Sequence, residues 1–203
     1  MTRRFEGDRL VIATHNKGKL EEFAALLAPL NIACVSAGDL GLGEPDETET
    51  TFLGNARIKA HAAARASGLP ALADDSGLSV DALDGAPGVY TADWAATPTG
   101  RDFGMAMEKT WALLEAKQAA FPRRAQFRCT LVLAWPDGHD EYVESLAPGQ
   151  LVWPRRGAEG HGYDPMFQPD GLTVTFAEMP AEAKNAISHR GKAVAAMLAK
   201  CFT

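Results

Sequence analysis

Two adjacent aspartates interrupt an apolar stretch of this chain and constrain how that stretch can fold. They lie in the segment LADDSGLSV, residues 72–80. Carboxylates are rarely buried unless they are paired, hydrogen-bonded or bound to a metal. Two of them side by side repel each other, which raises one pKa unless a cation neutralises the pair. The segment is therefore either a site that handles a divalent ion or a proton, or a polar turn between two short strands in which Gly77 supplies the bend.

The size and charge of the chain limit the classes of protein to which it can belong. Its 203 residues suffice for one well-buried domain, and its 46% hydrophobic and 23% charged residues are typical of globular proteins in solution. The formal net charge of −6 argues against general binding to nucleic acid, which needs many contacts from Lys and Arg to phosphates. A local cluster of cations could still hold a small polyanion. We expect a single domain over residues 1–203.

The cysteines and the lack of long apolar runs indicate the compartment. Cys34, Cys129 and Cys201 are scattered in no metal-ligand spacing, as expected of reduced thiols. No apolar run approaches the roughly 18 residues that a membrane span needs. No apolar region follows Arg3 and Arg4, so we expect no signal peptide. These features predict a cytoplasmic protein with no membrane partner.

Hydrophobic periodicity predicts an α/β fold. Apolar runs predict a pair of short strands around the two aspartates and further strands at residues 10–13, 32–35, 127–135 and 141–151. Helical spacing predicts helices at residues 19–30, 52–66, 101–119 and 192–201, and Thr51 can cap the second of them. Residues 157–171 are Gly-rich and are expected to be irregular. We expect a long mixed sheet flanked by helices, with two lobes and a central substrate cleft.

Residues 14–19, with the sequence THNKGK, lie between a predicted strand and a predicted helix. The backbone amides at a helix N-terminus are unsatisfied donors, and the helix dipole favours an anion there. Thr14 and Asn16 add side-chain donors, and Lys17 and Lys19 add positive charge. The segment can cradle a triphosphate, although it lacks the glycine spacing of a Walker motif. The alternative is an ordinary turn between strand and helix with solvated lysines.

The acidic segment EPDETE, residues 44–49, is a candidate for metal binding. Mg²⁺ usually keeps several waters and takes only one or two protein carboxylates. Asp46 or Glu47 could supply a carboxylate that acts together with Asp75. The alternative is an acidic loop that is merely solvated.

Two segments near the C-terminus are candidates for ligand binding. One combines polar residues with glycines, and the other places polar residues at the start of a predicted helix. In GHGYDPMF, residues 160–167, the glycines allow a ligand near the backbone, Tyr163 offers a stacking face, and Asp164 could bind a ligand or fix the loop. KNAISHRGK, residues 184–192, places a hydroxyl, an imidazole and a guanidinium at a helix start, where anions or polar base edges bind well. The alternatives are a simple turn in the first segment, and solvated charges with a structural His189 in the second.

Taken in order, these segments resemble the inosine/xanthosine triphosphate pyrophosphatase family, whose members hydrolyse non-standard purine nucleoside triphosphates. The resemblance covers the chain from about residue 10 to the C-terminus, and the matching pieces are residues 13–19, 51–60, 73–78, 85–90, 162–167 and 187–191. It implies an ITPase-like fold with a deep cleft, and a homodimer. It also implies Mg²⁺-dependent cleavage of ITP, dITP and XTP between the α- and β-phosphates, which gives a nucleoside monophosphate and pyrophosphate.

The resemblance also implies roles for individual residues. Asp75 would be the catalytic base and a metal ligand, with Asp74 beside it, and Lys59 would face the phosphates. Asp46 or Glu47 would supply the second metal carboxylate. The residues that would bind the substrate are Thr14, His15, Asn16, Lys17, Gly18, Lys19, Ser76, His161, Gly162, Tyr163, Asp164, Lys184, His189 and Arg190.

Base recognition is the point at which this sequence departs from the family. Members commonly carry Phe or Trp where this chain has His161, so stacking on the base would be weaker or would come from Tyr163. A hydrogen bond from Arg190 or His189 to the purine 6-oxo group would favour hypoxanthine and xanthine over adenine.

Two other functions compete with this interpretation. One is a related pyrophosphatase of the septum-inhibitor type that acts on pyrimidine or modified nucleotides. The Ser-His-Arg-Gly and Gly-Tyr-Asp-Pro segments argue against it. The other is a nucleotide-binding module without catalysis, which has little use for two carboxylates beside a triphosphate.

Overall fold

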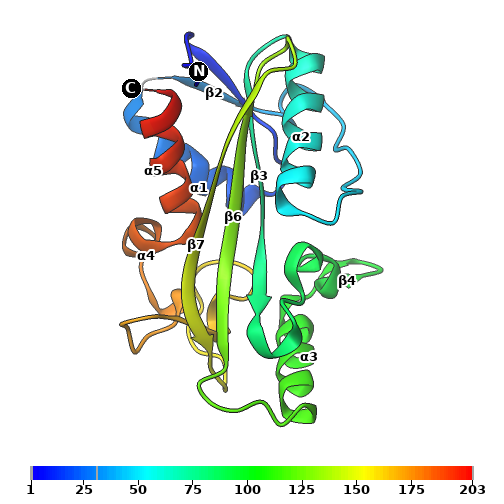
Figure 1. Ribbon diagram of the computed structural model, residues 1–203, viewed down its shortest axis with the longest axis vertical. Coiled ribbons are helices and arrows are strands. Elements are labelled where there is room, and N and C mark those ends of the chain that lie inside the picture. The colour runs from blue at the N-terminus through cyan, green and yellow to red at the C-terminus, as the bar shows by residue number, and fades with distance from the viewer. Residues whose placement is uncertain (1, 31, 203) are drawn as a thin grey trace. The chain divides into compact units, whose positions relative to one another are not determined.

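The computed structural model describes residues 2–30 and 32–202 of the chain, shown in Figure 1, and it contains two compact units. Unit 1 takes the residues up to 76, residues 129–145 and the residues from 190 onward. Unit 2 takes residues 77–128 and 146–189. Each unit has its own hydrophobic clusters.

The elements form a mixed sheet with flanking helices. The strands are β1 (Arg9–Ile12), β2 (Ala33–Ser36), β3 (Ala71–Val80), β4 (Ala96–Thr97), β5 (Gly100–Arg101), β6 (Arg124–Ala134), β7 (Asp140–Leu151) and β8 (Phe167–Pro169). The helices are α1 (Lys17–Leu27), α2 (Phe52–Ser67), α3 (Phe103–Ala116), α4 (Ala181–Ile187) and α5 (His189–Cys201). The larger sheet has the order β2-β1-β3-β6-β7-β8, with β1 parallel to β2 and β3, and β7 antiparallel to β8. The predicted α/β class with a mixed sheet is confirmed.

In unit 1 the side chains of the strands alternate between two faces of the sheet, and each face has its own cluster. One face packs against α1 and α5 through a cluster that includes Leu10, Ile12, Leu72, Leu131 and Leu133 with Phe23, Leu27, Val194 and Met197. The opposite face packs against α2 through Val11, Ala13, Ala71, Ala73 and Val132 with Ala56, Ala60 and Ala64. This alternation decides where each polar residue of β3 points.

The second helix is the best predicted element. The Thr51 side chain accepts a hydrogen bond from the Gly54 amide at 3.1 Å, so it caps α2 as expected. The helix ends at Gly68, whose φ of 69° suits the left-handed conformation that a helix C-cap often needs. The alanines on its buried face let α2 approach the sheet closely.

Other boundaries differ from the sequence-based expectation. The pair of short strands around the aspartates is wrong, because β3 runs through Ala71–Val80 as one strand and Gly77 makes no turn. β3 lies between β1 and β6 in the sheet, so its backbone groups can find partners on both sides. The sequence did not predict α4, and α5 begins at His189 rather than at residue 192.

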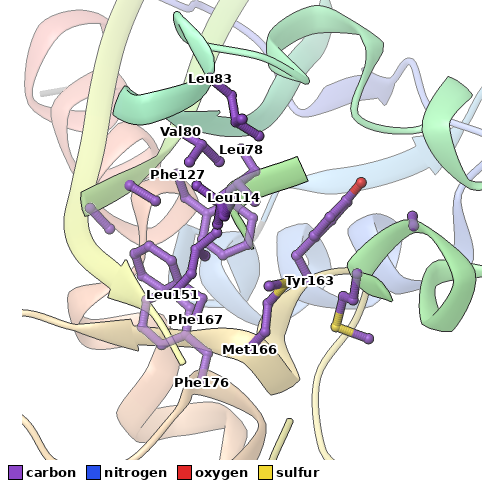
Figure 2. Close-up of a cluster of buried hydrophobic side chains, with 14 of the residues drawn as sticks. Leu78, Val80, Leu83, Leu114, Phe127, Leu151, Tyr163, Met166, Phe167 and Phe176 are labelled. Carbon is purple, nitrogen blue, oxygen red and sulfur yellow. The ribbon is translucent and has the colours of Figure 1, made fainter. Parts of the chain in front are cut away.

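The core of unit 2 is rich in aromatic rings (Figure 2). Phe127 and Phe167 have ring centroids 4.6 Å apart, and Phe167 and Phe176 are 5.0 Å apart. Leu78, Val80 and Leu83 pack into the same cluster. β7 and β8 bring part of this cluster together, since Leu151 is opposite Phe167 in their antiparallel register. No helix of the described residues is both long and apolar enough to cross a membrane.

A glycine in β7 is required by the pairing with β8. A Cβ at Gly149 would lie 2.4 Å from the Gln168 carbonyl oxygen and 2.7 Å from the Phe167 ring. We expect Gly149→Ala to lower the free energy of unfolding by about 1–3 kcal/mol, because the added atom meets backbone that cannot move away cheaply. Urea unfolding measures this. Gly43→Ala is the control, since a Cβ there meets nothing within 4 Å. Equal effects of the two substitutions would contradict the register of β7 and β8.

Candidate active site

Asp74 and Asp75 point to opposite faces of the sheet, because they are successive residues of one strand. Asp74 lies on the face covered by α1 and α5, and Asp75 lies on the face covered by α2. Their exposed fractions are only 2% and 4%. The two carboxylates therefore have different hydrogen-bond and ion-pair partners.

Asp74 is surrounded by cations. Its Oδ2 lies 3.0 Å from Lys19 Nζ of α1 and 3.3 Å from Arg190 Nη2 of α5. Burial alone would raise the pKa of Asp74, but the charges of Lys19, Arg190 and Lys59 outweigh it and hold the pKa well below its ordinary value. Asp74 is thus a permanent anion that ties two helices to β3.

The hydrogen bonds to the Asp75 carboxylate come from neutral groups within the described residues. Its Oδ2 accepts a hydrogen bond from Asn55 Nδ2 at 3.2 Å, and its Oδ1 accepts one from the Ser76 amide at 2.9 Å. Burial raises the pKa of Asp75 to about 6, despite the opposing charges of Lys59 and Lys19. Repulsion from Asp74 raises this pKa less than burial or repulsion from Glu47 does. A carboxylate that titrates near neutrality can exchange a proton under physiological conditions, as a general base must.

Lys59 links the acidic loop to the aspartates. It lies on α2 with 7% exposure, and its Nζ donates a hydrogen bond to Glu47 Oε1 at 2.5 Å. Burial alone would lower the pKa of Lys59, but Asp74, Asp75 and Glu47 together raise it above the ordinary value. The lysine therefore stays charged beside the carboxylates.

The two candidates for the second metal carboxylate have different surroundings. Glu47 is held next to the cluster by Lys59, whereas Asp46 is exposed and makes no hydrogen bond or ion pair within the described part of the chain. No three His, Cys, Asp or Glu side chains gather in a metal-binding arrangement among residues 2–30 and 32–202. Two carboxylates nevertheless suffice for Mg²⁺ that also binds water and phosphate. The neutral contacts of Asp75 leave its carboxylate suited to such an ion.

The segment that was expected to hold phosphates is built as the start of α1. The Asn16 side chain accepts a hydrogen bond from the Lys19 amide at 3.1 Å, and Thr14 Oγ1 accepts one from the Asn16 amide at 3.1 Å. Both side chains act as acceptors here, so the Thr14 hydroxyl proton and the Asn16 Nδ2 remain donors. Lys17 and Gly18 form the first turn of α1, where backbone amides point out of the helix end.

His15 connects this segment to the acidic loop. Its Nε2 is 2.9 Å from the Leu42 carbonyl oxygen, and its Nδ1 is 3.9 Å from Glu44 Oε2. The imidazole is thus positioned to hold the two loops of unit 1 together, beside the first turn of α1.

Arg190 is already engaged within unit 1. Its Nη1 donates to Glu22 of α1, and its Nη2 donates to Ser76 Oγ at 3.0 Å as well as contacting Asp74. Its Nε is buried and finds no acceptor in the part of the chain that the structure describes. The guanidinium therefore holds Asp74 and Ser76 of β3 next to Glu22 of α1.

The predicted residues of unit 2 form a separate polar group. Asp164 Oδ2 accepts hydrogen bonds from Lys184 Nζ and from the His161 amide, both at 2.7 Å, so Asp164 fixes this loop. Gly162 has a φ of 66°, which favours glycine. His161 is exposed, and the buried His189 ring stacks on Phe127 with centroids 4.8 Å apart.

The expected stacking role of Tyr163 is not supported by its position. The side chain is 1% exposed, and its ring packs edge-on against Phe103 at 5.9 Å. Figure 2 shows Tyr163 among the side chains of the unit 2 core. A ring in this position offers no open face to a purine base.

Sequence reasoning missed two residues of the unit 1 cluster. Glu22 lies one turn after Lys19 on α1 and holds Arg190. Asn55 accepts a hydrogen bond from the Glu49 amide at 2.9 Å while it donates to Asp75, so it joins the acidic loop to the strand. The signal for Asn55 was its position one turn before Lys59 on the alanine-rich face of α2, where a polar side chain needs a specific partner.

Replacing Asn55 with alanine is expected to destabilise unit 1. The substitution leaves the Glu49 amide and Asp75 without their partner, and such losses typically cost about 1–3 kcal/mol. Denaturant unfolding measures the change. Asn185→Ala is the matched control, since Asn185 makes no side-chain hydrogen bond within the described residues, and we expect a change below about 0.5 kcal/mol. A loss at Asn55 no larger than that at Asn185 would contradict the bridging role.

Comparison with known proteins covers nearly the whole chain. The Ham1 family model matches residues 10–200. A dITP/XTP pyrophosphatase of Ruegeria pomeroyi is 68% identical over 202 residues, which cover 100% of this chain and 99% of that protein. A protein of the same name from Rhodospirillum centenum is 58% identical, with 98% of each chain covered. The solved structure of a HAM1 protein from Coxiella burnetii is similar with a TM-score of 0.85 and 36% identity, over 93% of this chain and 95% of that one.

Proposed function

The chain belongs to the Ham1 family, and we propose that it hydrolyses the non-standard purine nucleoside triphosphates ITP, dITP and XTP to the monophosphate and pyrophosphate. This reaction would remove such nucleotides before they are incorporated into DNA or RNA. The observation that carries the proposal is the buried Asp75, with a pKa of about 6, in one charge cluster with Lys59 and Lys19. Phosphoryl transfer depends on positioning and charge neutralisation, which this cluster can supply.

Asp75 is the proposed general base. It takes a proton from the water that attacks the triphosphate, and Asn55 and the Ser76 amide hold its carboxylate in place. A pKa of about 6 keeps most of the group ionised at neutral pH while leaving it basic enough to accept the proton. Asp74 has a different role. It stays ionised and positions Lys19 and Arg190.

The cations of unit 1 would bind and neutralise the phosphates. The first turn of α1 offers backbone amides, Thr14 and Asn16 offer side-chain donors, and Lys17 adds charge. Lys19 and Lys59 would offset charge that develops on the leaving pyrophosphate.

The reaction is proposed to require Mg²⁺. Asp75 and Glu47 would hold it, with Asp46 as the alternative to Glu47. When bound, the ion neutralises phosphate charge and lowers the pKa of a coordinated water. The neutral contacts of Asp75 and the closeness of Glu47 to Lys59 support this choice of ligands.

Base selection is proposed to use the 6-oxo group. His189 or Arg190 would donate a hydrogen bond to it, and adenine would leave that donor unpaired. Ser76, Gly162, Asp164 and Lys184 would complete the surroundings of the substrate. Because Tyr163 is buried, stacking on the base would fall to His161.

Pyrophosphate release from ITP, XTP, GTP and ATP, with and without Mg²⁺, tests the proposed function. We expect ITP and XTP to exceed ATP in kcat/KM by at least about 100-fold, because an unpaired buried donor discriminates strongly. Equal rates on all four would contradict selection through the 6-oxo group. Binding without pyrophosphate release would favour the non-catalytic module, and preference for a pyrimidine triphosphate would favour the septum-inhibitor type.

Two further parts of the proposal follow from the resemblance. The enzyme is proposed to act as a homodimer and to work in the cytoplasm, where the nucleotide pool lies. The mass of the protein in solution tests the first, and fractionation of cells tests the second.

A further inference from the structure

Asn55 joins two segments of unit 1 that are distant in sequence. Its side chain is buried, with 2% exposure. It accepts a hydrogen bond from the Glu49 amide at 2.9 Å and donates one to Asp75 Oδ2 at 3.2 Å. A buried polar side chain with two specific partners holds both of them in place relative to its own helix. One amide group therefore connects the acidic loop, residues 44–49, to strand β3.

The two ends of the Asn55 amide cannot exchange places. The Glu49 backbone N–H can only donate, so the end of the amide that faces it is the carbonyl oxygen. The Nδ2 group is then directed to the Asp75 carboxylate, which can only accept when it is ionised. A flipped Asn55 would place a donor against a donor and an acceptor against an acceptor. The loop amide therefore selects the orientation in which Asn55 donates to Asp75.

The other hydrogen bond of the Asp75 carboxylate is a local one. The Ser76 amide that binds Oδ1 belongs to the next residue of the same strand, so it ties the carboxylate to β3 alone. Asn55 ties the second oxygen to α2, the helix that also carries Lys59. A group that takes part in proton transfer has to be held within roughly 0.5 Å of its productive position, and contacts from a second element supply that precision.

The acidic loop lies close against the start of α2. A Cβ at Gly54 would lie 2.6 Å from both Cβ and Cγ of Glu49. One turn after Asn55, Lys59 holds Glu47 of the same loop through an ion pair. A displacement of the loop would take the Glu49 amide away from Asn55 and would remove the constraint on the orientation of its side chain.

We propose that Asn55 is a positioning residue that orients the Asp75 carboxylate for proton transfer, and that the acidic loop controls this orientation through the Glu49 amide. The inference rests on the proposed function, in which Asp75 is the base. A displaced loop would slow proton transfer to Asp75, and Asn55 is the link between the two.

Asn55→Asp separates the positioning of Asp75 from the support of the loop. An aspartate at this position still accepts the hydrogen bond from the Glu49 amide, but it has no Nδ2 to donate to Asp75. We expect kcat for ITP to fall by about 10–100-fold, the usual effect of losing a partner that orients a functional side chain, with KM changed by less than about 3-fold. Pyrophosphate release at saturating Mg²⁺ measures both constants. A native kcat for Asn55→Asp would overturn the proposal.

A double-mutant cycle tests whether Asn55 acts through Asp75. Asn55→Ala introduces no charge, and we expect it too to lower kcat by about 10–100-fold in the native background. In the Asp75→Asn background the same substitution should change kcat by less than about 2-fold, because the base that Asn55 orients is already absent. Circular dichroism verifies that each variant is folded. Equal factors in the two backgrounds would overturn the proposal, since a general loss of structure would act in both.

Gly54→Ala tests the role of the loop without changing Asn55 or Asp75. The added Cβ meets Glu49 and should displace the loop, so we expect kcat to fall by at least about 10-fold in the native background and to change little in the Asn55→Ala background. Gly43→Ala is the matched control, because Gly43 directly precedes the loop and a Cβ there meets nothing within 4 Å. Equal rates for the two glycine variants would contradict control by the loop.

Failure of this inference and failure of the proposed function give different results. A native protein that releases no pyrophosphate from ITP or XTP would overturn the proposed function and this inference with it. Native release together with an unimpaired Asn55→Asp variant would overturn the inference alone.

Discussion

Replacing Asp75 with asparagine is expected to lower kcat for ITP by about 10²–10⁴-fold at saturating Mg²⁺, the usual effect of removing a general base. Asparagine has nearly the same shape, and its carbonyl can still accept the hydrogen bond from Asn55. It cannot take a proton from water. The rate of pyrophosphate release measures the change, and KM should change less than kcat because most phosphate contacts lie on other residues.

The pH profile of the native enzyme supplies a second readout of the same role. Because burial raises the pKa of Asp75 to about 6, kcat/KM at low Mg²⁺ should fall as the pH drops below that value and the base becomes protonated. Asp39→Asn is the control, since Asp39 is exposed and the substitution removes the same charge from unit 1. Near-normal turnover of Asp75→Asn would contradict the assignment of the base.

Asp74→Asn is expected to have its largest effect on stability. The substitution removes the shared anionic partner of the partly exposed Lys19 and the buried Arg190, and breaking a buried pair typically costs about 3–5 kcal/mol. The pKa of Asp74 is depressed in the folded protein, so its contribution to stability is present above the unfolded value of 3.8 and is lost as the pH falls through the folded pKa. The difference between native protein and variant should therefore be greatest near neutral pH and should shrink in acid.

Asp170→Asn is a matched control for this prediction. Asp170 pairs with Arg124 through contacts of 2.6 and 2.8 Å, but its side chain is 48% exposed. Exposed pairs contribute at most about 1 kcal/mol, so the loss should be small. If urea unfolding gave equal losses for Asp74→Asn and Asp170→Asn, Asp74 would not be the anchor of α1 and α5.

The opposite expectations for two neighbouring aspartates follow from the alternation of β3. Sequence patterns predicted β1, β2, β6, β7 and the capped helix α2, because these depend on local spacing. In one continuous strand, alternation places Asp74 on the same side as Leu72 and Asp75 on the same side as Ala73. The turn-forming residues Ser76 and Gly77 obscured this, since local propensity is overridden when a strand has neighbours on both sides.

What the sequence could not predict are contacts between distant parts of the chain. Glu22 and Arg190 meet only because α1 and α5 cover the same face of the sheet. Asn55 becomes a site residue only when the acidic loop folds back over the start of α2. Tyr163 looked like a stacking surface from its neighbours in sequence, but Phe103 covers its ring.

The bond that is broken is the central point of the proposed function, and phosphorus NMR of a complete reaction with ITP or XTP tests it most directly. Cleavage between the α- and β-phosphates predicts equal amounts of nucleoside monophosphate and pyrophosphate, with no nucleoside diphosphate at any time. Accumulation of nucleoside diphosphate and orthophosphate instead would mean cleavage between the β- and γ-phosphates. That result would contradict a pyrophosphatase built around Asp75.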